Sequence, residues 1–490
     1  MDDIFVPCLV PPSLATEEGS GLSPSSVLLD NTAYISAVAV SNATTAVAET
    51  SAGTPIHVSF CLAPHPPRLS YMCVHFPGPA APLSAAIPDG APAARCVMQA
   101  PRVISTHAGL VLLRVPQPGA MDITNPRYLD YFVYTASPGP GTASLHRLRQ
   151  PLDAAADFAI FRCSGGTYRY IIAGLGNTTD REKFRLQLYD SDTGRWTSTL
   201  LSVDAPQRDT VLPIPSTATE LGFHYTSKVI TLGGPRATIG WVDLWRGILL
   251  CDVLDDKPVL RDVPLPKPSK GNRPYFCRGG PHRYREIDVV TLPGPGQQHI
   301  EIKYIEMETR PGEDLLPPRR SVVDTSDSDD DDDESDKDLV VAPYWKATIW
   351  TMPVPVGSWK DWRKDRDSRV DVTDIAVDDP RHCEVLLRLP RLRTDQESAA
   401  MSLRRLITAY PALELGVDGD LVIYLLSKVD FMDREGWVIA VGARDKKLRG
   451  IAELDSRKND FFRRYYLHTD ISKFPTEATG ASGALVERKK

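Results

Sequence analysis

The stretch "IGWVDLWRGILLCDVL", residues 239–254, holds two tryptophans four positions apart, followed by an almost continuous apolar run. If the first part is a β-strand, alternation along it places Trp241, Asp243 and Trp245 on the same side. Gly247 then permits a bend, and the run "ILLCDVL" is typical of a strand buried on both faces. The pattern predicts a hairpin in the middle of a sheet, with both tryptophan rings in the core.

Asp243 lies between the two tryptophans, so the same pattern buries a carboxylate. A buried charge is strongly unfavourable unless it is paired, and we therefore expect Asp243 to cap a turn or to pair with Arg246 or Arg261. The alternative, in which Trp241, Asp243 and Trp245 bind a ligand, stays open. The structural signature predicted from this stretch consists of Trp241, Asp243, Trp245, Arg246, Gly247 and Asp252.

A strand, a polar turn and a second strand recur along the chain, starting at Tyr131, Phe184, Gly247, Ala347 and Gly436. The first two intervals, of 53 and 63 residues, suit one four-stranded propeller blade each. The later intervals, of 100 and 89 residues, suit one blade with an insertion or two blades. The sequence thus predicts an all-β, β-propeller-like body of about six four-stranded blades, with a pair of β-sandwiches as the competing architecture.

This body is expected to form a single domain over residues 26–475, between a disordered N-terminus (1–25) and a disordered basic tail (476–490). One short helix is predicted near 395–409. Its sequence, "TDQESAAMSLRRLITAY", begins with a capping box from Thr394 to Glu397 and ends before Pro411. Its apolar positions fall on one face, which predicts a helix packed on a sheet.

An acidic string, "DTSDSDDDDDESDKD", occupies residues 324–338 and holds ten acidic residues and one lysine. It cannot form a packed core, so a disordered insertion is predicted over about 310–340. Ser326, Ser328 and Ser335 each precede an acidic residue by three positions, which suits phosphorylation by an acidophilic kinase. The insertion is either a solvated spacer or a mask over basic segments such as 444–449.

The segment "GWVDLWRGILLCDVLDDKPVLRDVPLPKP" (240–268) resembles the signature of the plant family called domain of unknown function 1618, which is abundant in grasses. Three other parts resemble further segments of that family: "HPPRLSYMCVHFPG", "GLVLLR" with "YFVYTA", and "GWVIAVGARDKKLRGIAEL". The resemblance spans roughly residues 25 to 475. The family in turn is similar to F-box-associated and kelch-like β-propeller domains, so the resemblance implies a propeller fold. No F-box is recognisable here, and the resemblance implies no activity.

The sequence contains no catalytic motif, and no cofactor or metal is expected. His282 and Glu286 are four residues apart, but two ligands do not make a metal site. The eight cysteines contain no CxxC pair and are expected to be buried thiols in a reducing compartment. With neither a secretory signal nor a long apolar run, the chain is expected to be soluble, cytoplasmic or nuclear, and not secreted.

These observations favour a non-catalytic protein-interaction module that is a monomer, has an unknown protein partner and makes no membrane contact. The first alternative is an enzyme whose active site is assembled from loops at one end of the propeller. Three or more titratable groups converging at the ends of the central channel would favour this enzyme, whereas a bare apolar or mixed rim would favour binding. The second alternative is nucleic-acid binding through the C-terminal basic and aromatic strands, "ARDKKLR" and "FFRRYY". The body outside the acidic string is nearly neutral, which disfavours nucleic acid.

Overall fold

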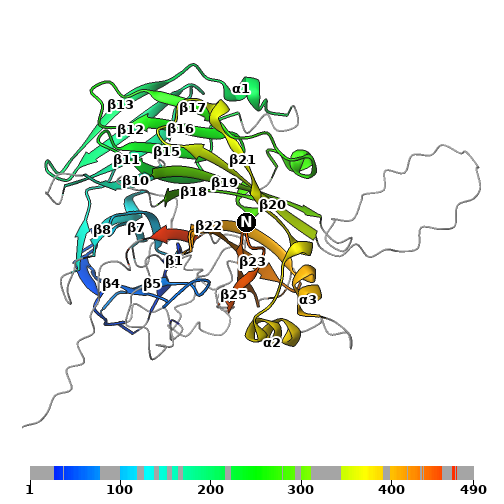
Figure 1. Ribbon diagram of the computed structural model, residues 1–490. Coiled ribbons are helices and arrows are strands. Elements are labelled where there is room, and N and C mark those ends of the chain that lie inside the picture. Colours follow the sequence, from blue (N-terminus) through cyan, green and yellow to red (C-terminus); the bar gives the residue numbers. More distant parts are fainter. Residues whose placement is uncertain are drawn as a thin grey trace, which may run out of the picture. The chain divides into compact units, whose positions relative to one another are not determined.

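The computed structural model shows that most secondary-structure elements of the described residues are β-strands (Figure 1). It describes residues 11, 27–36, 38–77, 100–117, 126–136, 143–151, 157–163, 169–215, 222–278, 280–292, 299–310, 344–389, 398–416, 418–430, 433, 435–454, 466–469 and 471. The chain divides into two compact units. The first comprises Met1–Gly176, Arg185–Leu200 and Arg464–Lys490, and the second Asn177–Phe184 and Leu201–Arg463. The single domain expected over 26–475 stays a prediction.

The first unit is built from antiparallel groups of strands, in the orders β2-β5-β4-β3, β6-β7-β8-β9 and β10-β11-β12-β13. In the first group β2 joins β5 in parallel. A separate ladder pairs β1 with β26, segments from near the two ends of the chain. The strands are β1 (Val27–Asp30), β2 (Tyr34–Ile35), β3 (Ala46–Glu49), β4 (Pro55–Cys61), β5 (Tyr71–His75), β6 (Arg102–His107), β7 (Leu110–Pro116), β8 (Leu129–Thr135), β9 (Ser144–Arg147), β10 (Asp157–Arg162), β11 (Tyr170–Asn177), β12 (Lys183–Asp190), β13 (Arg195–Asp204) and β26 (Tyr466–Thr469).

The second unit contains three further groups, in the orders β17-β16-β15-β14, β18-β19-β20-β21 and β22-β23-β24-β25. In the first of these, Leu260 and Arg261 of β17 also pair in parallel with Val203 and Asp204, the end of β13 that belongs to the second unit. The elements are α1 (Arg208–Val211), β14 (Lys228–Gly233), β15 (Thr238–Asp243), β16 (Gly247–Asp252), β17 (Leu260–Pro264), β18 (Arg285–Leu292), β19 (His299–Arg310), β20 (Tyr344–Pro353), β21 (Arg363–Asp371), α2 (Pro380–Arg388), α3 (Ala399–Arg405), β22 (Ile407–Leu415), β23 (Leu421–Lys428), β24 (Trp437–Gly442) and β25 (Leu448–Glu453).

The recurring strand-turn-strand segment has a definite place in these groups. Its five copies are the pairs β8–β9, β12–β13, β16–β17, β20–β21 and β24–β25, the third and fourth strands, in chain order, of successive groups. Each of the two longer spacings between copies, 100 and 89 residues, therefore corresponds to one four-stranded group with an insertion. The acidic segment separates β19 from β20, and the two longer helices precede β22. The predicted all-β, β-propeller-like class with about six four-stranded blades is confirmed at the level of these groups.

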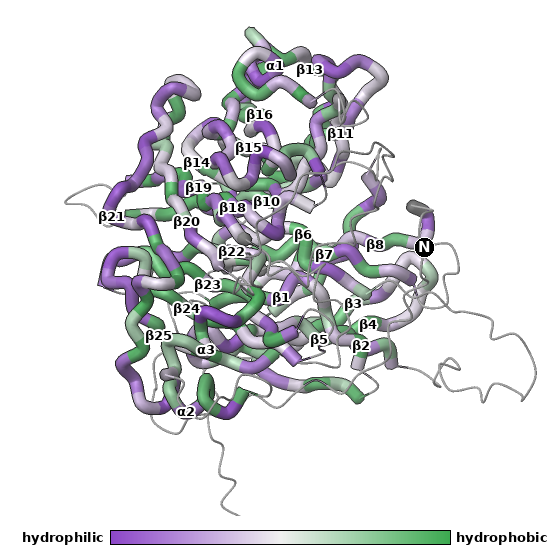
Figure 2. Tube along the Cα trace, turned by 90° about the vertical axis from the view of Figure 1, so that its right-hand side faces the viewer, coloured by the Kyte–Doolittle hydropathy of each residue, from purple (hydrophilic) through white to green (hydrophobic). Residues whose placement is uncertain are grey.

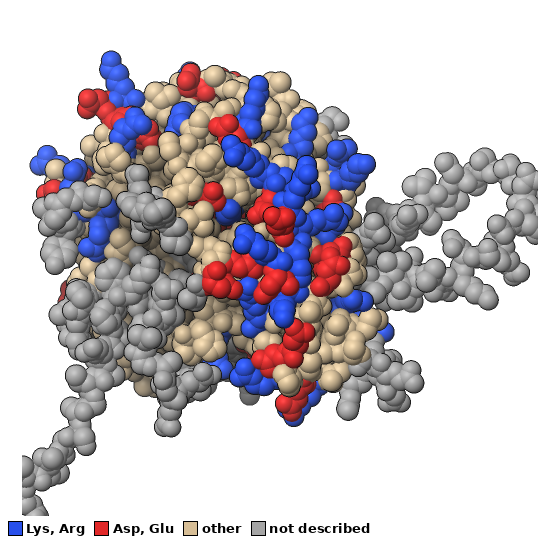
Figure 3. Space-filling model, in the orientation of Figure 1, with Lys and Arg blue, Asp and Glu red and all other residues tan. Residues whose placement is uncertain are grey.

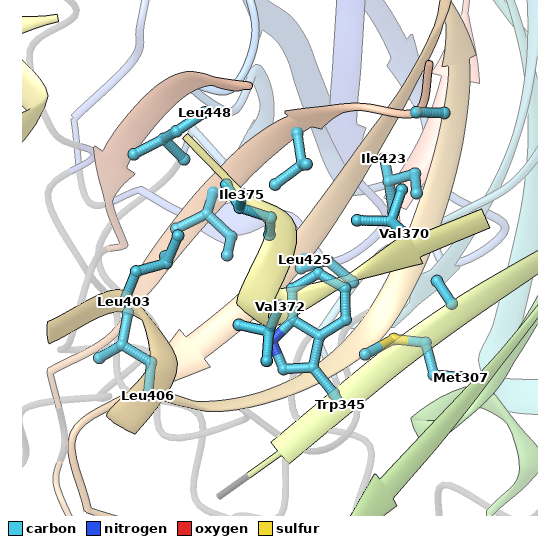
Figure 4. Packing of buried hydrophobic residues seen from close by; sticks show 14 of the residues in the cluster. Met307, Trp345, Val370, Val372, Ile375, Leu403, Leu406, Ile423, Leu425 and Leu448 are labelled. Atoms are coloured by element: carbon cyan, nitrogen blue, oxygen red, sulfur yellow. The ribbon is translucent and has the colours of Figure 1, made fainter. Parts of the chain in front are cut away.

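The core of the β18–β25 region forms around Trp345, which is 1% exposed (Figure 4). Met307 of β19 and Leu425 of β23 belong to the same cluster, so side chains of two successive groups of strands share one core. Leu403 of α3 belongs to it as well, which places this helix against the sheet, as the sequence predicts. Strands β23 and β24 are hydrophobic along much of their length (Figure 2), as expected for strands buried on both faces.

The helix predicted near 395–409 is present but shorter, as α3. Its N-cap is Ser398, whose side chain accepts a hydrogen bond from the Met401 amide. The predicted capping-box residues, Thr394 and Glu397, lie outside the described residues. Tyr410 and Pro411 belong to β22 and not to the helix. Tyr410 has a φ of 56°, and the strand register shifts between residues 409 and 412, so a β-bulge accommodates this proline.

A second helix, α2, departs from the sequence prediction, which places one helix near 395–409. Its start does carry a sequence signal. The Asp379 side chain accepts a hydrogen bond from the Arg381 amide, and Pro380 occupies the first turn. Only Leu386 is buried in this helix, so its apolar periodicity is weak.

Several predicted segments lie outside the described residues. They are most of the N-terminal 1–25, the tail 476–490, the insertion from residue 311 to its predicted end near 340, and Ser326, Ser328 and Ser335 within that insertion. Disorder and phosphorylation there stay predictions. Arg310 itself is the last residue of β19.

Candidate functional site

The signature stretch forms a tight hairpin. Strand β15 ends at Asp243, residues 244–246 form the turn, and β16 begins at Gly247. The alternation expected through Arg246 is therefore wrong, because Trp245 belongs to the turn and not to the strand. Trp241 is 0% exposed, and Trp245, at 6%, packs in the same cluster as Val242 and Leu244. Both rings are buried, although they do not share a strand face.

Asp243 organises this turn. Its Oδ1 accepts a hydrogen bond from the Trp245 amide at 2.9 Å, and its backbone carbonyl accepts one from the Arg246 amide at 3.0 Å. Its Oδ2 accepts a longer bond, 3.4 Å, from the Tyr225 amide. Burial raises the pKa of Asp243, against the opposing effects of Arg208, these amide bonds and Arg246. Asp243 is thus a turn cap.

The two basic residues expected as partners of Asp243 are engaged elsewhere. The buried Arg246 guanidinium pairs with Asp209 of α1. Arg261 donates to the Val356 carbonyl at 3.0 Å.

Trp245 connects two groups of strands through Arg285, the first residue of β18. The Arg285 guanidinium carbon lies 4.9 Å from the centroid of the Trp245 ring, and Nη1 donates to the Trp245 carbonyl at 3.2 Å. Arg285 is 0% exposed and pairs with Glu306 at 2.8 Å. A desolvated cation over an aromatic face is a strong contact, so Trp245 and Arg285 fasten the hairpin to the next group.

Gly247 and Asp252 complete the signature. A Cβ on Gly247 would lie 2.8 Å from the Val263 carbonyl oxygen of β17, so the glycine permits close approach of two backbones and not the expected bend. Asp252 accepts a hydrogen bond from the Thr238 hydroxyl at 2.5 Å and lies 3.3 Å from Arg236. Both residues therefore serve the hairpin itself.

A buried polar network surrounds Arg208 at the start of α1. Its Nε and Nη2 donate to Asp262 Oδ1 at 2.8 and 2.6 Å, and the Gln207 and Arg208 amides both donate to Oδ2 at 2.9 Å. Arg208 Nη1 lies 2.8 Å from His224 Nδ1. A guanidinium only donates, so this Nδ1 accepts and the ring is neutral. Burial, and then the charge of Arg208, lower the pKa of His224 well below its usual value.

This network holds a short segment that we call the aromatic loop, residues 222–225. The His224 ring packs edge-on against Phe184, with centroids 5.9 Å apart, and its carbonyl accepts from Asn177 Nδ2 at 3.0 Å. The Tyr225 amide donates to Asp243, as described above. The backbone is thus fixed from several directions.

The remaining two side chains of the aromatic loop face solvent. Phe223 is 40% exposed and Tyr225 67% exposed. The Arg181 guanidinium lies 5.4 Å from the centroid of the Phe223 ring. No motif in the sequence marks this loop. Its only signal is a pair of aromatics flanking a histidine in "GFHYTS".

A second cluster brings titratable groups together between β14 and β18. Lys228 Nζ lies 3.1 Å from Glu286 and 2.5 Å from Asp288, and His282 Nδ1 lies 3.4 Å from Glu286. Four titratable side chains thus meet in the interior of the second unit. The enzyme alternative concerns groups at the ends of a central channel, so it stays a prediction. His282 and Glu286 do meet, but no group of three or more His, Cys, Asp or Glu able to hold a metal occurs among the described residues.

The charges in this cluster compensate each other. Burial disfavours the charged form of Lys228, but Asp288 and Glu286 outweigh it and raise the pKa of Lys228. Burial likewise opposes ionisation of Glu286, yet Lys228 and His282 lower its pKa to about 2. A general acid or base needs a pKa near the working pH, and both shifts lead away from it. The arrangement is that of a structural ion cluster.

The basic segment 443–449, expected as a hairpin turn, links β24 to β25. Arg449 pairs with Asp418, Asp420 and Asp445 at 2.9, 2.9 and 3.0 Å. Lys447 pairs with Asp378 at 2.7 Å. Acidic and basic side chains are likewise interspersed over the neighbouring strand β21 (Figure 3). These cations already have acidic partners, and Arg463 and Arg464 lie outside the described residues.

Comparison with known proteins supports a family relation over part of the chain. The family model described as "Protein of unknown function (DUF1618)" matches residues 241–424, from within β15 into β23. This match begins at Trp241 and includes the whole signature. No curated protein matches the chain. Within the described residues, no helix is long and apolar enough to cross a membrane.

Solved structures give only distant likenesses. The α-L-arabinanase of Penicillium chrysogenum complexed with arabinobiose is 8% identical, with a TM-score of 0.26, over 89% of this chain and 99% of that one. The WD40 domain of SCAP from fission yeast is 10% identical, with a TM-score of 0.26, over 71% of this chain and 68% of that one. At such TM-scores these likenesses carry no argument.

Proposed function

We propose that this chain is a non-catalytic protein-interaction module and that the aromatic loop is its contact surface. The observation that carries the proposal is the exposure of Phe223 and Tyr225 on either side of the buried His224. Aromatic residues and arginine are enriched in the centres of protein interfaces, where few residues supply most of the binding energy. Arg181, stacked on Phe223, adds a cation to the same surface.

The anchoring of the loop supports this proposal. A loop that is ordered before binding loses less conformational entropy when the partner docks. Here His224 is held by Arg208 and Asn177, and Tyr225 by Asp243. The exposed rings are therefore presented on a backbone that needs little rearrangement.

Two observations weigh against the alternatives. Lys228 and Glu286 pair with each other, and the pKa of each is shifted away from the range that an acid–base catalyst needs. Arg449 and Lys447, two of the cations of 443–449, pair with nearby carboxylates, which leaves them weaker ligands for phosphate groups. The identity of the partner, the monomeric state, a cytoplasmic or nuclear location, and the wider kinship with plant propeller proteins remain proposals.

The test compares the full chain with the double variant Phe223→Ala/Tyr225→Ala. Each chain carries an affinity tag and is expressed in its native cells, and co-purifying proteins are quantified by mass spectrometry. Leu387→Ala is the matched control, because Leu387 on α2 is 44% exposed and lies outside the aromatic loop. We expect a discrete partner with the wild type and the control, and binding of that purified partner weakened at least about tenfold in the double variant.

The proposal fails if the double variant binds this partner with unchanged affinity. It also fails if Leu387→Ala weakens binding as much as the double variant does. Circular dichroism of all three chains establishes that they are equally folded.

A further inference from the structure

One face of the β4–β5 ladder gathers two cysteines. In its antiparallel register Ser59 faces Cys73 and Cys61 faces Tyr71. Cys61 and Cys73 are therefore diagonal neighbours on the same face of the sheet. The opposite face is packed in the apolar core of the first unit, where Val58 and Val74 are fully buried.

The Cys73 thiol, a diagonal neighbour on the same face, stabilises the Cys61 thiolate by hydrogen bonding, and Tyr71 has a smaller effect of the same sign. Cys73 is only 2% exposed, whereas Cys61 is partly exposed and so accessible to a small reagent. The hydrogen bond from Cys73, against the opposing effect of burial, lowers the pKa of Cys61 to about 7. Cys61 is thus substantially a thiolate at neutral pH.

Three other described cysteines behave in the opposite way. Burial raises the pKa of Cys163, that of Cys251 to about 12 and that of Cys277 to about 11. Thiols in such surroundings are unreactive, because the thiolate is the nucleophile. Cys61 therefore has the surroundings of a reactive cysteine, with a second thiol within reach.

We propose that Cys61 and Cys73 form a peroxide-reactive dithiol, in which Cys61 is the attacking residue and Cys73 the resolving residue. The Cys61 thiolate attacks one oxygen of hydrogen peroxide, and the O–O bond breaks. The departing hydroxide takes up the proton that Cys61 released when it became a thiolate, and so leaves as water. Cys61 is now a sulfenic acid. The Cys73 sulfur attacks the Cys61 sulfur, the S–O bond breaks, and the hydroxyl leaves with the Cys73 proton as a second water. Two thiols lose two electrons, and one peroxide is reduced to two waters.

The position of Cys61 permits the movement that the bond requires. Diagonal neighbours have Cα atoms about 7–8 Å apart, whereas a disulfide needs about 4.4–6.8 Å. Cys61 is the last residue of β4, directly before the connection to β5. A strand end shifts more easily than a strand centre. Oxidation is therefore expected to draw this end and residues 62–70 towards β5.

The test is differential alkylation of the reduced full chain. The chain is exposed to increasing hydrogen peroxide, quenched with N-ethylmaleimide, digested and examined by mass spectrometry. We expect a Cys61–Cys73 linked peptide that is lighter by two hydrogens and is restored by dithiothreitol. Cys383, also partly exposed, is the matched control and should stay alkylable at the same peroxide dose.

Two variants assign the roles. In Cys73→Ser, Cys61 should accumulate as a sulfenic acid that dimedone traps, whereas in Cys61→Ser, Cys73 should remain a thiol. The proposal is overturned if Cys61 oxidises no faster than Cys383, or if it pairs with another cysteine such as Cys96. If a serine variant fails to fold, the proposal is tested on the wild-type chain by its alkylation rates. Cys61 must then react with iodoacetamide at pH 7 at least about threefold faster than Cys383.

Discussion

Two pairs of aromatic side chains in the second unit share one anchor and have opposite environments. Asp243 binds the Trp245 amide with one carboxylate oxygen and the Tyr225 amide with the other. Trp241 and Trp245 are 0% and 6% exposed, whereas Phe223 and Tyr225 are 40% and 67% exposed. The same buried carboxylate thus stabilises a hairpin that packs inwards and a loop that presents its rings outwards.

The comparison shows that aromatic content alone does not identify a binding surface. Of the two conspicuous tryptophans of the signature, Trp245 holds successive strand groups together through Arg285, and Trp241 is buried within β15. The inconspicuous loop carries the accessible rings. The signature is therefore the structural support of the aromatic loop. Variants that change a buried ring or an exposed ring separately test this assignment.

The largest expected effect comes from removing either tryptophan. Trp241→Ala and Trp245→Ala should each lower the free energy of unfolding by about 3–5 kcal/mol, because a large buried ring leaves a cavity. Urea unfolding followed by circular dichroism measures this loss. If both variants unfold like the wild type and lose only partner binding, the tryptophans belong to the binding surface, and the two aromatic pairs do not differ in role.

The ion cluster at the start of β14, three residues beyond Tyr225, predicts a loss in acid. Burial acts to raise the pKa of Glu286, but Lys228 and His282 outweigh it, so the folded-state pKa is about 2 against an ordinary 4.5. Because this pKa is depressed on folding, the stabilisation is complete above about pH 4.5 and is lost as the pH falls towards 2. The loss amounts to roughly 3 kcal/mol.

Lys228→Met separates this contribution from general acid denaturation. At neutral pH the variant should be destabilised by about 3–5 kcal/mol, because two buried carboxylates lose their cation. Its stability should also fall less steeply than that of the wild type between about pH 4.5 and 2. Identical pH profiles for the two chains, measured by denaturant unfolding, would show that Glu286 is not held by Lys228.

Asp243→Ala should affect both aromatic pairs. The buried Trp245 amide and the part-buried Tyr225 amide lose their acceptor, which costs about 1–3 kcal/mol of stability. Hydrogen exchange at these two amides should accelerate together relative to the rest of β15. Faster exchange at Trp245 alone would mean that the aromatic loop is anchored without Asp243.

The smallest expected effect belongs to the exposed rings. Phe223→Ala and Tyr225→Ala should each change the free energy of unfolding by no more than about 0.5 kcal/mol, as is usual for surface substitutions. Differential scanning calorimetry measures the difference. A loss of several kcal/mol would place these rings in the core and remove the basis of the proposed contact surface.

The strand groups were predictable because their signal is local and repeated. The strand-turn-strand copies starting at Tyr131, Phe184 and Gly247 mark third and fourth strands. The capping role of Asp243 followed from the cost of burying a lone charge. The side to which Trp245 points was not predictable by alternation, because residues 244–246 leave the strand without a proline, glycine or asparagine to mark the turn.

The aromatic loop was beyond sequence reasoning for a different reason. Its anchors Asn177, Arg208 and Asp262 come from separate segments, and only the folded chain brings them to His224. The ion cluster likewise joins Lys228 to residues about 60 positions further along the chain. Nothing in the local pattern near Phe223 shows that the backbone there is fixed.

Hydroxyl-radical footprinting of the native full chain tests the division between the two aromatic pairs most directly, because it reports all four side chains in one sample. The account predicts rapid oxidation of Phe223 and Tyr225, and protection of Trp241 and Trp245 until denaturant unfolds the chain. Oxidation of Trp245 in the native chain as fast as that of Tyr225, after correction for the intrinsic reactivity of each ring, would contradict it.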